Sequence, residues 1–190
     1  MDALKNRIIK DGVILQKDVL KVDSFLNHQI DTAFMQQIGA EFKKRFEDCD
    51  VTKILTIEAS GIAVSFATSQ FFNFAPVVFA KKGTATNMSE QSYHSSVHSY
   101  TRNQDFVVSV AKQYLKPTDK VLILDDFLAQ GEALGALISI VSQAGCQLVG
   151  CGIVIEKAYQ KGGKELRAQG VRIESLVRIM KMSEEGIEFC

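Results

Sequence analysis

Two adjacent carboxylates, Asp125 and Asp126, stand where an apolar run gives way to a glycine turn and then a helix. The run 121–124 is continuous, as expected of a strand that is buried on both faces in a parallel sheet. Apolar residues then recur at helical spacing from Ala133 to Val141. Because the first backbone N–H groups of a helix have no intrahelical partner, the turn before this helix predicts an anion site. The carboxylates predict a ligand that donates hydrogen bonds or carries positive charge.

A phosphorylated sugar satisfies both halves of this pattern. Ribose hydroxyls can donate hydrogen bonds to Asp125 and Asp126 while a 5′-phosphate lies on the N–H groups of the helix start. A magnesium ion fits as well, because it takes oxygen ligands from ribose and diphosphate. The same pattern also fits a buried strand that meets solvent at the two acids, with Gly131 serving only the turn. The residues by themselves leave both interpretations open.

The stretch from Val121 to Ala133 resembles the phosphoribosyl-diphosphate signature of type I phosphoribosyltransferases, and in particular that of the xanthine branch. The resemblance implies that Asp125 and Asp126 are catalytic and orient the ribose. It implies that the 5′-phosphate is held by backbone N–H groups of Ala129, Gln130, Gly131, Glu132 and Ala133. The commoner signature has threonines at the first, second and fifth of these positions. Without their hydroxyls, more of the hydrogen bonds to the phosphate would come from backbone N–H groups here. Purine-sensing regulators on the same fold share that departure.

A second strand, turn and helix is predicted at 53–72, with a turn of small residues that lets backbone approach a ligand. As a bare motif it is an ordinary turn. The resemblance implies that the leaving diphosphate meets N–H groups of Ala59, Ser60 and Gly61. The next predicted strand, 76–80, ends in Lys81 and Lys82. Lysines at a strand end are commonly solvated, but the resemblance makes one of them a diphosphate partner.

Residues 19–31 mix apolar and polar side chains and show neither the helical nor the strand period. By pattern they are a packed connecting segment. The resemblance implies instead a hood in which Leu20 and Asn27 belong to the xanthine pocket. It also implies that Lys157, after a predicted strand at 147–155, donates to the purine 6-oxo group. An apolar lid with an amide at the edge of a flat heterocycle is physically reasonable.

Residues 83–105 are polar, rich in hydroxyls and poor in core residues. A stretch of this length inside a compact domain predicts an active-site lid. An alternative is a loose hairpin that uses Val97, Tyr100 and Phe106. The resemblance places a mobile loop here that closes over the sugar. The two histidines of the segment are expected to be solvated rather than to act as bases.

Strands and helices alternate along the chain, which predicts the α/β class with a doubly wound, mostly parallel sheet and helices on both faces. The resemblance implies the type I phosphoribosyltransferase fold in one domain, 1–190. A small hood would comprise about 1–31 plus C-terminal residues. The predicted strands are 53–58, 76–80, 106–110, 121–124, 147–155 and 171–179, and the predicted helices are 2–10, 31–49, 62–72, 133–144 and 164–169.

Composition excludes several classes of protein. The chain has 190 residues with 46% hydrophobic content, enough for one packed α/β domain. It carries 22 basic and 22 acidic residues, so it has no basic excess for nucleic-acid binding. Four cysteines without a CxxC pair and three histidines argue against a zinc site. No apolar run reaches the roughly 18 residues of a membrane span. We therefore expect a soluble cytoplasmic protein with free thiols and no membrane or nucleic-acid partner.

The resemblance implies conversion of xanthine and 5-phosphoribosyl-1-diphosphate to xanthosine 5′-monophosphate and diphosphate. Mg²⁺ would be bound mainly through the sugar diphosphate, and the protein would be a homodimer. One alternative is a hypoxanthine/guanine phosphoribosyltransferase. Another, motivated by the missing threonines, is a non-catalytic purine-responsive regulator. A regulator would normally need an added DNA-binding domain, for which the residues before Val19 are too few. No residue stands out as acceptor of the purine proton.

Overall fold

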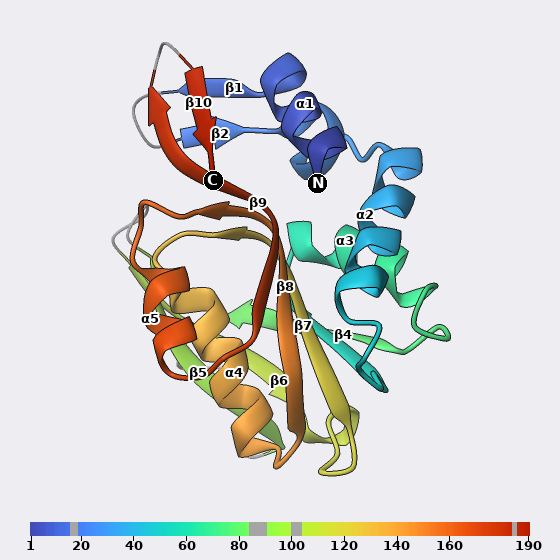
Figure 1. Ribbon diagram of the computed structural model, residues 1–190. Coiled ribbons are helices and arrows are strands. Elements are labelled where there is room, and N and C mark those ends of the chain that lie inside the picture. Colours follow the sequence, from blue (N-terminus) through green and yellow to red (C-terminus); the bar gives the residue numbers. More distant parts are fainter. Residues whose placement is uncertain (16–18, 84–90, 100–103, 184–185) are drawn as a thin grey trace.

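The central element of the molecule is an eight-stranded sheet with the order β10-β9-β8-β7-β3-β4-β6-β5 (Figure 1). The computed structural model describes residues 1–15, 19–83, 91–99, 104–183 and 186–190. The strands are β3 (Lys53–Ile57), β4 (Val77–Gly83), β5 (Ser92–Ser99), β6 (Gln104–Ala111), β7 (Lys120–Leu128), β8 (Gln147–Lys157), β9 (Ile173–Ser183) and β10 (Gly186–Phe189).

The middle of the sheet is parallel, and its edges are antiparallel. Strands β4, β3, β7, β8 and β9 pair in parallel, whereas β6 and β5 on one side and β10 on the other pair antiparallel. The carboxyl ends of the parallel strands therefore meet at one edge of the sheet, where open α/β sheets bind ligands. The predicted mostly parallel α/β sheet is confirmed.

Helices cover both faces of the sheet (Figure 1). On one face, α2 (Thr32–Arg45) and α3 (Ser60–Ser69) pack over an apolar core that includes Leu122 and Leu124 of β7. On the other face, α4 (Glu132–Gln143) and α5 (Gly162–Ala168) pack over a second core that includes Val121 and Ile123. Successive residues of β7 thus enter different cores, which is why its sequence is apolar without alternation. Among the described helices, none combines the length and the apolar character that crossing a membrane requires.

The N-terminal segment lies over the carboxyl edge of the sheet, beside the C-terminal strand (Figure 1). We use the name hood for its elements. The terminal amino group donates to the Leu176 carbonyl at 2.8 Å, and the Lys5 ammonium donates to the Cys190 carbonyl at 3.4 Å. The hood consists of α1 (Asp2–Asp11), β1 (Val13–Leu15), β2 (Val19–Lys21) and the π-helical turn η1 (Asp23–Asn27).

Residues 19–31 fit neither common period, which by pattern predicts a connecting segment and by resemblance a hood, and the π-turn at 23–27 explains the irregular pattern. The His28 N–H donates to the Asp23 carbonyl at 3.2 Å, a bond between residues five apart. Such a turn buries residues at a spacing that neither the 3.6 nor the 2.0 period describes. Phe25 and Leu26 are buried as a result.

One arginine fastens the hood to the rest of the domain. The Arg7 guanidinium donates to Asp31 at 2.8 Å and pairs with Asp11 one turn along α1. It also lies 5.1 Å and 5.6 Å from the ring centres of Phe25 and Phe34. Asp31 itself caps α2 by accepting from the Phe34 N–H at 3.0 Å. The hydrogen bonds from Phe34 and Arg7 lower the pKa of Asp31.

Part of the predicted lid is a regular strand. Residues 92–99 form β5, paired with β6 in the hairpin that the sequence offered as the alternative. This edge strand is held from α4, because the Gln143 amide donates to the His94 carbonyl at 2.8 Å, and Val97 is buried. The segments 84–90 and 100–103, with Tyr100, lie outside the described residues. Closure of a lid over the site stays a prediction.

Candidate active site

The two carboxylates lie at the carboxyl end of β7 in different environments. Asp125 is 5% exposed and accepts from the Asp126 N–H at 3.0 Å, while Asp126 is half-buried. Burial, reinforced by the neighbouring Asp126 charge, raises the pKa of Asp125 well above its usual range. Asp126 is therefore the more accessible of the two acids for a ligand.

A cavity of about 280 Å³ opens beside the acids and joins segments that the sequence analysis had assigned separately. It brings together the acidic end of β7, the turn between β3 and α3, one lysine of β4 and the first turn of α4. The lining residues are Ile57, Glu58, Ala59, Ser60, Lys82, Phe106, Asp125, Asp126 and Ala133.

The turn between β3 and α3 is packed directly against the acids. A Cβ atom on Gly61 would meet the Thr56 hydroxyl and lie 3.2 Å from Asp125 Oδ1, so only glycine fits this close approach. Glu58 accepts from the Lys82 N–H at 2.7 Å and ties the turn to β4. Glu58 was not among the predicted site residues, although its place at a strand end beside the turn was a usable signal.

The structure separates the two lysines of β4. Lys82 lines the cavity, with its ammonium 5.6 Å from the centre of the Phe106 ring, and its charge acts to lower the pKa of Asp125 against the stronger effects that raise it. Lys81 is exposed and does not line this cavity. Because neighbouring residues of a strand point to opposite sides, only one of the pair can face the site.

The loop that leads into α4 has the form of an anion cradle. We use the name phosphate loop for residues 129–133. Gly131 has a φ of 89°, a left-handed conformation that strongly favours glycine, and precedes the first residue of α4. It has no side chain that could cap the helix, so no N-cap side chain occupies the N–H groups of the first turn. This is the geometry in which helix starts bind phosphate.

Asn27 connects the hood to this site. Its amide nitrogen donates to Asp126 Oδ2 at 2.7 Å and to the Ser60 hydroxyl at 3.2 Å. A carboxylate only accepts, which fixes the nitrogen rather than the oxygen of the amide toward Asp126. One side chain thus joins η1, the acidic end of β7 and the start of α3.

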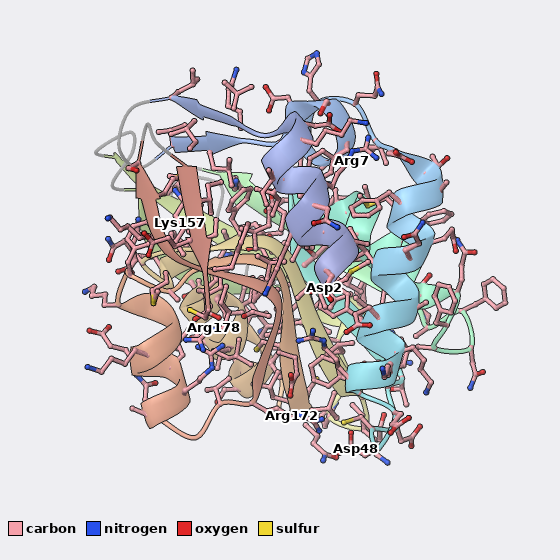
Figure 2. The ribbon with its side chains drawn as sticks, turned by 45° about the horizontal axis from the view of Figure 1, so that its top comes forward. Asp2, Arg7, Asp48, Lys157, Arg172 and Arg178 are labelled. Atoms are coloured by element: carbon pink, nitrogen blue, oxygen red, sulfur yellow. The ribbon has the colours of Figure 1, made fainter. Side chains whose placement is uncertain are left out.

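The other two residues predicted at the purine lie on different elements. Leu20 of β2 is 6% exposed, and its side chain packs in the apolar core under the hood. Lys157 ends β8 and is half-buried. Figure 2 shows it at the edge of the sheet that faces the hood strands. The contacts of these residues with a base stay predictions.

Comparison with known proteins gives the same assignment as the geometry. No protein-family model matches the chain. It is 52% identical to a xanthine phosphoribosyltransferase 1 of Clostridium perfringens, 50% identical to a xanthine phosphoribosyltransferase 2 of Clostridium botulinum and 49% identical to a xanthine phosphoribosyltransferase of Laribacter hongkongensis. Each alignment spans 189 residues and covers 100% of both chains.

Solved structures share the fold at low identity. An adenine phosphoribosyltransferase from Thermoanaerobacter pseudethanolicus superposes with a TM-score of 0.75 at 17% identity, covering 93% of this chain and 98% of that one. One from Giardia lamblia superposes with a TM-score of 0.72 at 22% identity, covering 84% and 86%. The fold and the paired acids beside their cradle therefore define a type I phosphoribosyltransferase. Within that class, the chain belongs to the xanthine phosphoribosyltransferase family. The family predicted from the signature is confirmed.

Proposed function

We propose that the protein transfers the 5-phosphoribosyl group of 5-phosphoribosyl-1-diphosphate to xanthine, giving xanthosine 5′-monophosphate and diphosphate in purine salvage. The cavity that joins Asp125, Asp126, Lys82 and the start of α4 carries this proposal. About 50% identity over the full length to xanthine phosphoribosyltransferases supports the choice of base. We place the reaction in the cytoplasm, where the four free cysteines would stay reduced.

The residues of the cavity suit a reaction that separates charge. Loss of the bond between the sugar and the diphosphate leaves positive charge on the ribose ring and negative charge on the leaving group. Asp126 would accept hydrogen bonds from ribose hydroxyls, with the 5′-phosphate on the phosphate loop. Lys82 and the N–H groups of residues 59–61 would stabilise the departing diphosphate. Holding all parts of the sugar diphosphate at once supplies the orientation that the displacement needs.

The donor set of the site fits Mg²⁺. Glu58, Asp125 and Asp126 bring carboxylate oxygens to one cavity, and oxygen is the ligand that Mg²⁺ prefers. Within the described part of the chain, no three histidine, cysteine or acidic side chains are close enough together to hold a metal by themselves, so the sugar diphosphate would have to supply most of the ligands. We propose that Asp126 or Glu58 holds the ion together with oxygens of the sugar diphosphate. When bound, Mg²⁺ would supply neutralisation of charge on the leaving diphosphate.

Release of diphosphate tests the activity directly. The purified protein would be supplied with 5-phosphoribosyl-1-diphosphate, Mg²⁺ and one of xanthine, hypoxanthine or guanine, and kcat/KM would be compared across the three bases. The highest value for xanthine is expected. A preference for hypoxanthine or guanine would replace the proposed base, and an absence of turnover with every base would overturn the enzyme assignment.

Lys157→Ala is expected to raise the KM for xanthine about 10- to 100-fold, because a hydrogen bond from a charged donor contributes roughly 1.5–3 kcal/mol. The KM for 5-phosphoribosyl-1-diphosphate should change little. Steady-state kinetics with each substrate varied in turn measures both values. Lys164→Ala is the matched control, since Lys164 is an exposed lysine of α5. If Lys157→Ala raises the KM for both substrates by a similar factor, the assignment of Lys157 to the base is wrong.

We propose that the protein is a homodimer, and an exposed apolar face supports this. A cavity of about 540 Å³ between α2 and α3 is lined mainly by apolar side chains, and Phe66 in it is 68% exposed. Contiguous apolar surface of this kind marks interaction sites. A second copy is a suitable occupant because the chain has zero formal net charge, so two copies do not repel each other. The cavity residues are Ile30, Thr32, Met35, Gln36, Ala59, Ile62, Ala63, Phe66 and Ala67.

Phe66→Glu is expected to convert the dimer to a monomer, because it places a charge in the middle of the apolar face. Light scattering coupled to size-exclusion chromatography measures the mass directly. Ile9→Glu is the control, since Ile9 on α1 is 65% exposed and lies outside this cavity. A wild-type monomer, or a Phe66→Glu variant that remains dimeric, would argue against an interface at this face.

A further inference from the structure

The corner before α5 packs against the back of the phosphate loop. The Gly162 N–H donates to the Ala129 carbonyl at 3.2 Å. A Cβ atom on Gly162 would lie 2.5 Å from the Gln130 carbonyl carbon and 2.6 Å from the Ala129 oxygen, closer than atoms can approach. The requirement for glycine here is one of space, and the atoms that would be displaced are backbone atoms of the phosphate loop. A side chain at position 162 therefore has to move the loop.

A partly buried ion pair keeps this corner in place from the other side. Glu156 of β8 is 2% exposed, and both of its oxygens accept from the Arg167 guanidinium of α5 at 2.7 Å. The Ser175 hydroxyl donates to the same carboxylate at 2.5 Å, and Arg178 lies 3.2 Å from it. A Cβ atom on Gly163 would lie 3.0 Å from the Glu156 carboxyl carbon, so α5 begins in direct contact with the pair.

These contacts connect the central sheet to the phosphate loop through α5. Glu156 is a residue of the sheet strand β8, and its carboxylate binds Arg167 of α5. Gly162, the first residue of α5, contacts the phosphate loop. Figure 2 shows Arg178 on the same side of the domain as Lys157, which directly follows Glu156 in β8. The phosphate loop is thus held in position by contacts outside the cavity beside the acids. Glu156, Gly162 and Arg167 do not line that cavity.

We infer that Gly162 is a positioning residue for the 5′-phosphate. By packing on Ala129 and Gly131 it sets the position of the loop N–H groups that receive the phosphate, and the Glu156–Arg167 pair keeps Gly162 there. This inference rests on the proposed function of the phosphate loop. The corner between β8 and α5 would then contribute to binding of the sugar diphosphate, although it lies outside the signature sequence.

Gly162→Ala tests the inference. The variant is expected to bind 5-phosphoribosyl-1-diphosphate about 10- to 100-fold more weakly, because small displacements of a binding group have effects of this order. The KM for xanthine should change less than about threefold by the same reasoning, because the displaced atoms belong to the phosphate loop alone. Isothermal titration with 5-phosphoribosyl-1-diphosphate and steady-state kinetics measure the two quantities. General loosening of the fold would lower the active fraction without this split between the substrates.

Gly135→Ala is the matched control. Gly135 lies in α4, four residues beyond Gly131, and a Cβ atom there meets nothing within 4 Å, so binding should be unchanged. Should Gly162→Ala fold poorly, Arg167→Lys takes its place. It keeps the charge and loses the bidentate pair, and the same selective weakening is expected. Unchanged binding, or equal losses for both substrates, overturns the inference. A wild-type protein that does not bind 5-phosphoribosyl-1-diphosphate overturns the proposed function instead.

Discussion

Replacing Asp126 with alanine is expected to lower kcat/KM for 5-phosphoribosyl-1-diphosphate by about 10²- to 10³-fold, the usual cost of removing one preorganised electrostatic partner from an active site. The carboxylate lines the cavity and is the acceptor of the Asn27 amide. Its loss removes both the proposed ribose acceptor and the anchor that orients Asn27. Initial rates of diphosphate release, with each substrate varied, measure the change.

The control for this variant is a carboxylate outside the site. Asp50 is paired with Lys120 at 2.8 Å, and its side chain is 74% exposed, so Asp50→Ala should leave kcat/KM unchanged. Circular dichroism and thermal unfolding should show that both variants remain folded. A loss below about threefold in Asp126→Ala would mean that the sugar does not lie against this acid, since a removed electrostatic partner costs far more.

Asp126 is the better residue to substitute because Asp125 is the more deeply buried of the two acids. Burial raises the pKa of Asp125, so its neutral form is the one that the folded protein favours. A carboxyl with a raised pKa in the folded state costs stability as the pH rises above its ordinary value of about 3.9. Substitution of Asp125 would therefore change activity and pH-dependent stability together. Asp126 is the more accessible acid, and its charge contributes to the raised pKa of Asp125, so the stability of Asp126→Ala should be measured at the pH of the assay.

The central strand and its helix could be predicted because their signals are local. Residues 121–124 are apolar without interruption since successive side chains enter two different cores. The spacing from Ala133 to Val141 is that of one buried helix face. Each pattern is complete within about ten residues, so no knowledge of the rest of the chain was required.

The contacts that assemble the site are not local, and the sequence could not place them. Asn27 and Asp126 are 99 positions apart, and their hydrogen bond depends on how the hood lies on the sheet. The choice between Lys81 and Lys82 depends on strand register. The predicted strand ended at residue 80, whereas β4 continues to Gly83 and so gives the two lysines opposite faces.

The same reasoning explains why Gly162 and Glu156 were missed. Nothing in the stretch from 156 to 163 is unusual for a strand end followed by a short helix. The significance of Gly162 appears only when the phosphate loop, about thirty positions earlier, is packed against it. Glu156 looks like a surface acid by its type, and only its partners in α5 and β9 explain why it is buried.

Arg167→Met is expected to lower the free energy of unfolding by about 3 kcal/mol at neutral pH, because it leaves the Glu156 carboxylate buried without its bidentate partner. This is the lower end of the usual range, since Arg178 and Ser175 still contact the carboxylate. Urea denaturation followed by circular dichroism measures the difference. Lys161→Met is the control, since its pair with Glu165 is exposed on both sides and contributes less than about 1 kcal/mol.

The pH dependence of this difference identifies its cause. Although burial alone would raise the pKa of Glu156, the hydrogen bonds from Arg167 and Ser175 outweigh it and lower the pKa. An acid with a lowered pKa stabilises the fold above its ordinary value, about 4.3 for glutamate, and loses that contribution as the pH falls through the folded-state value. The gap between wild type and Arg167→Met should therefore narrow as acidification protonates Glu156, first in the variant and at lower pH in the wild type. A gap that stays constant down to pH 3 would mean that Arg167 acts through the packing of its aliphatic stem rather than through the ion pair.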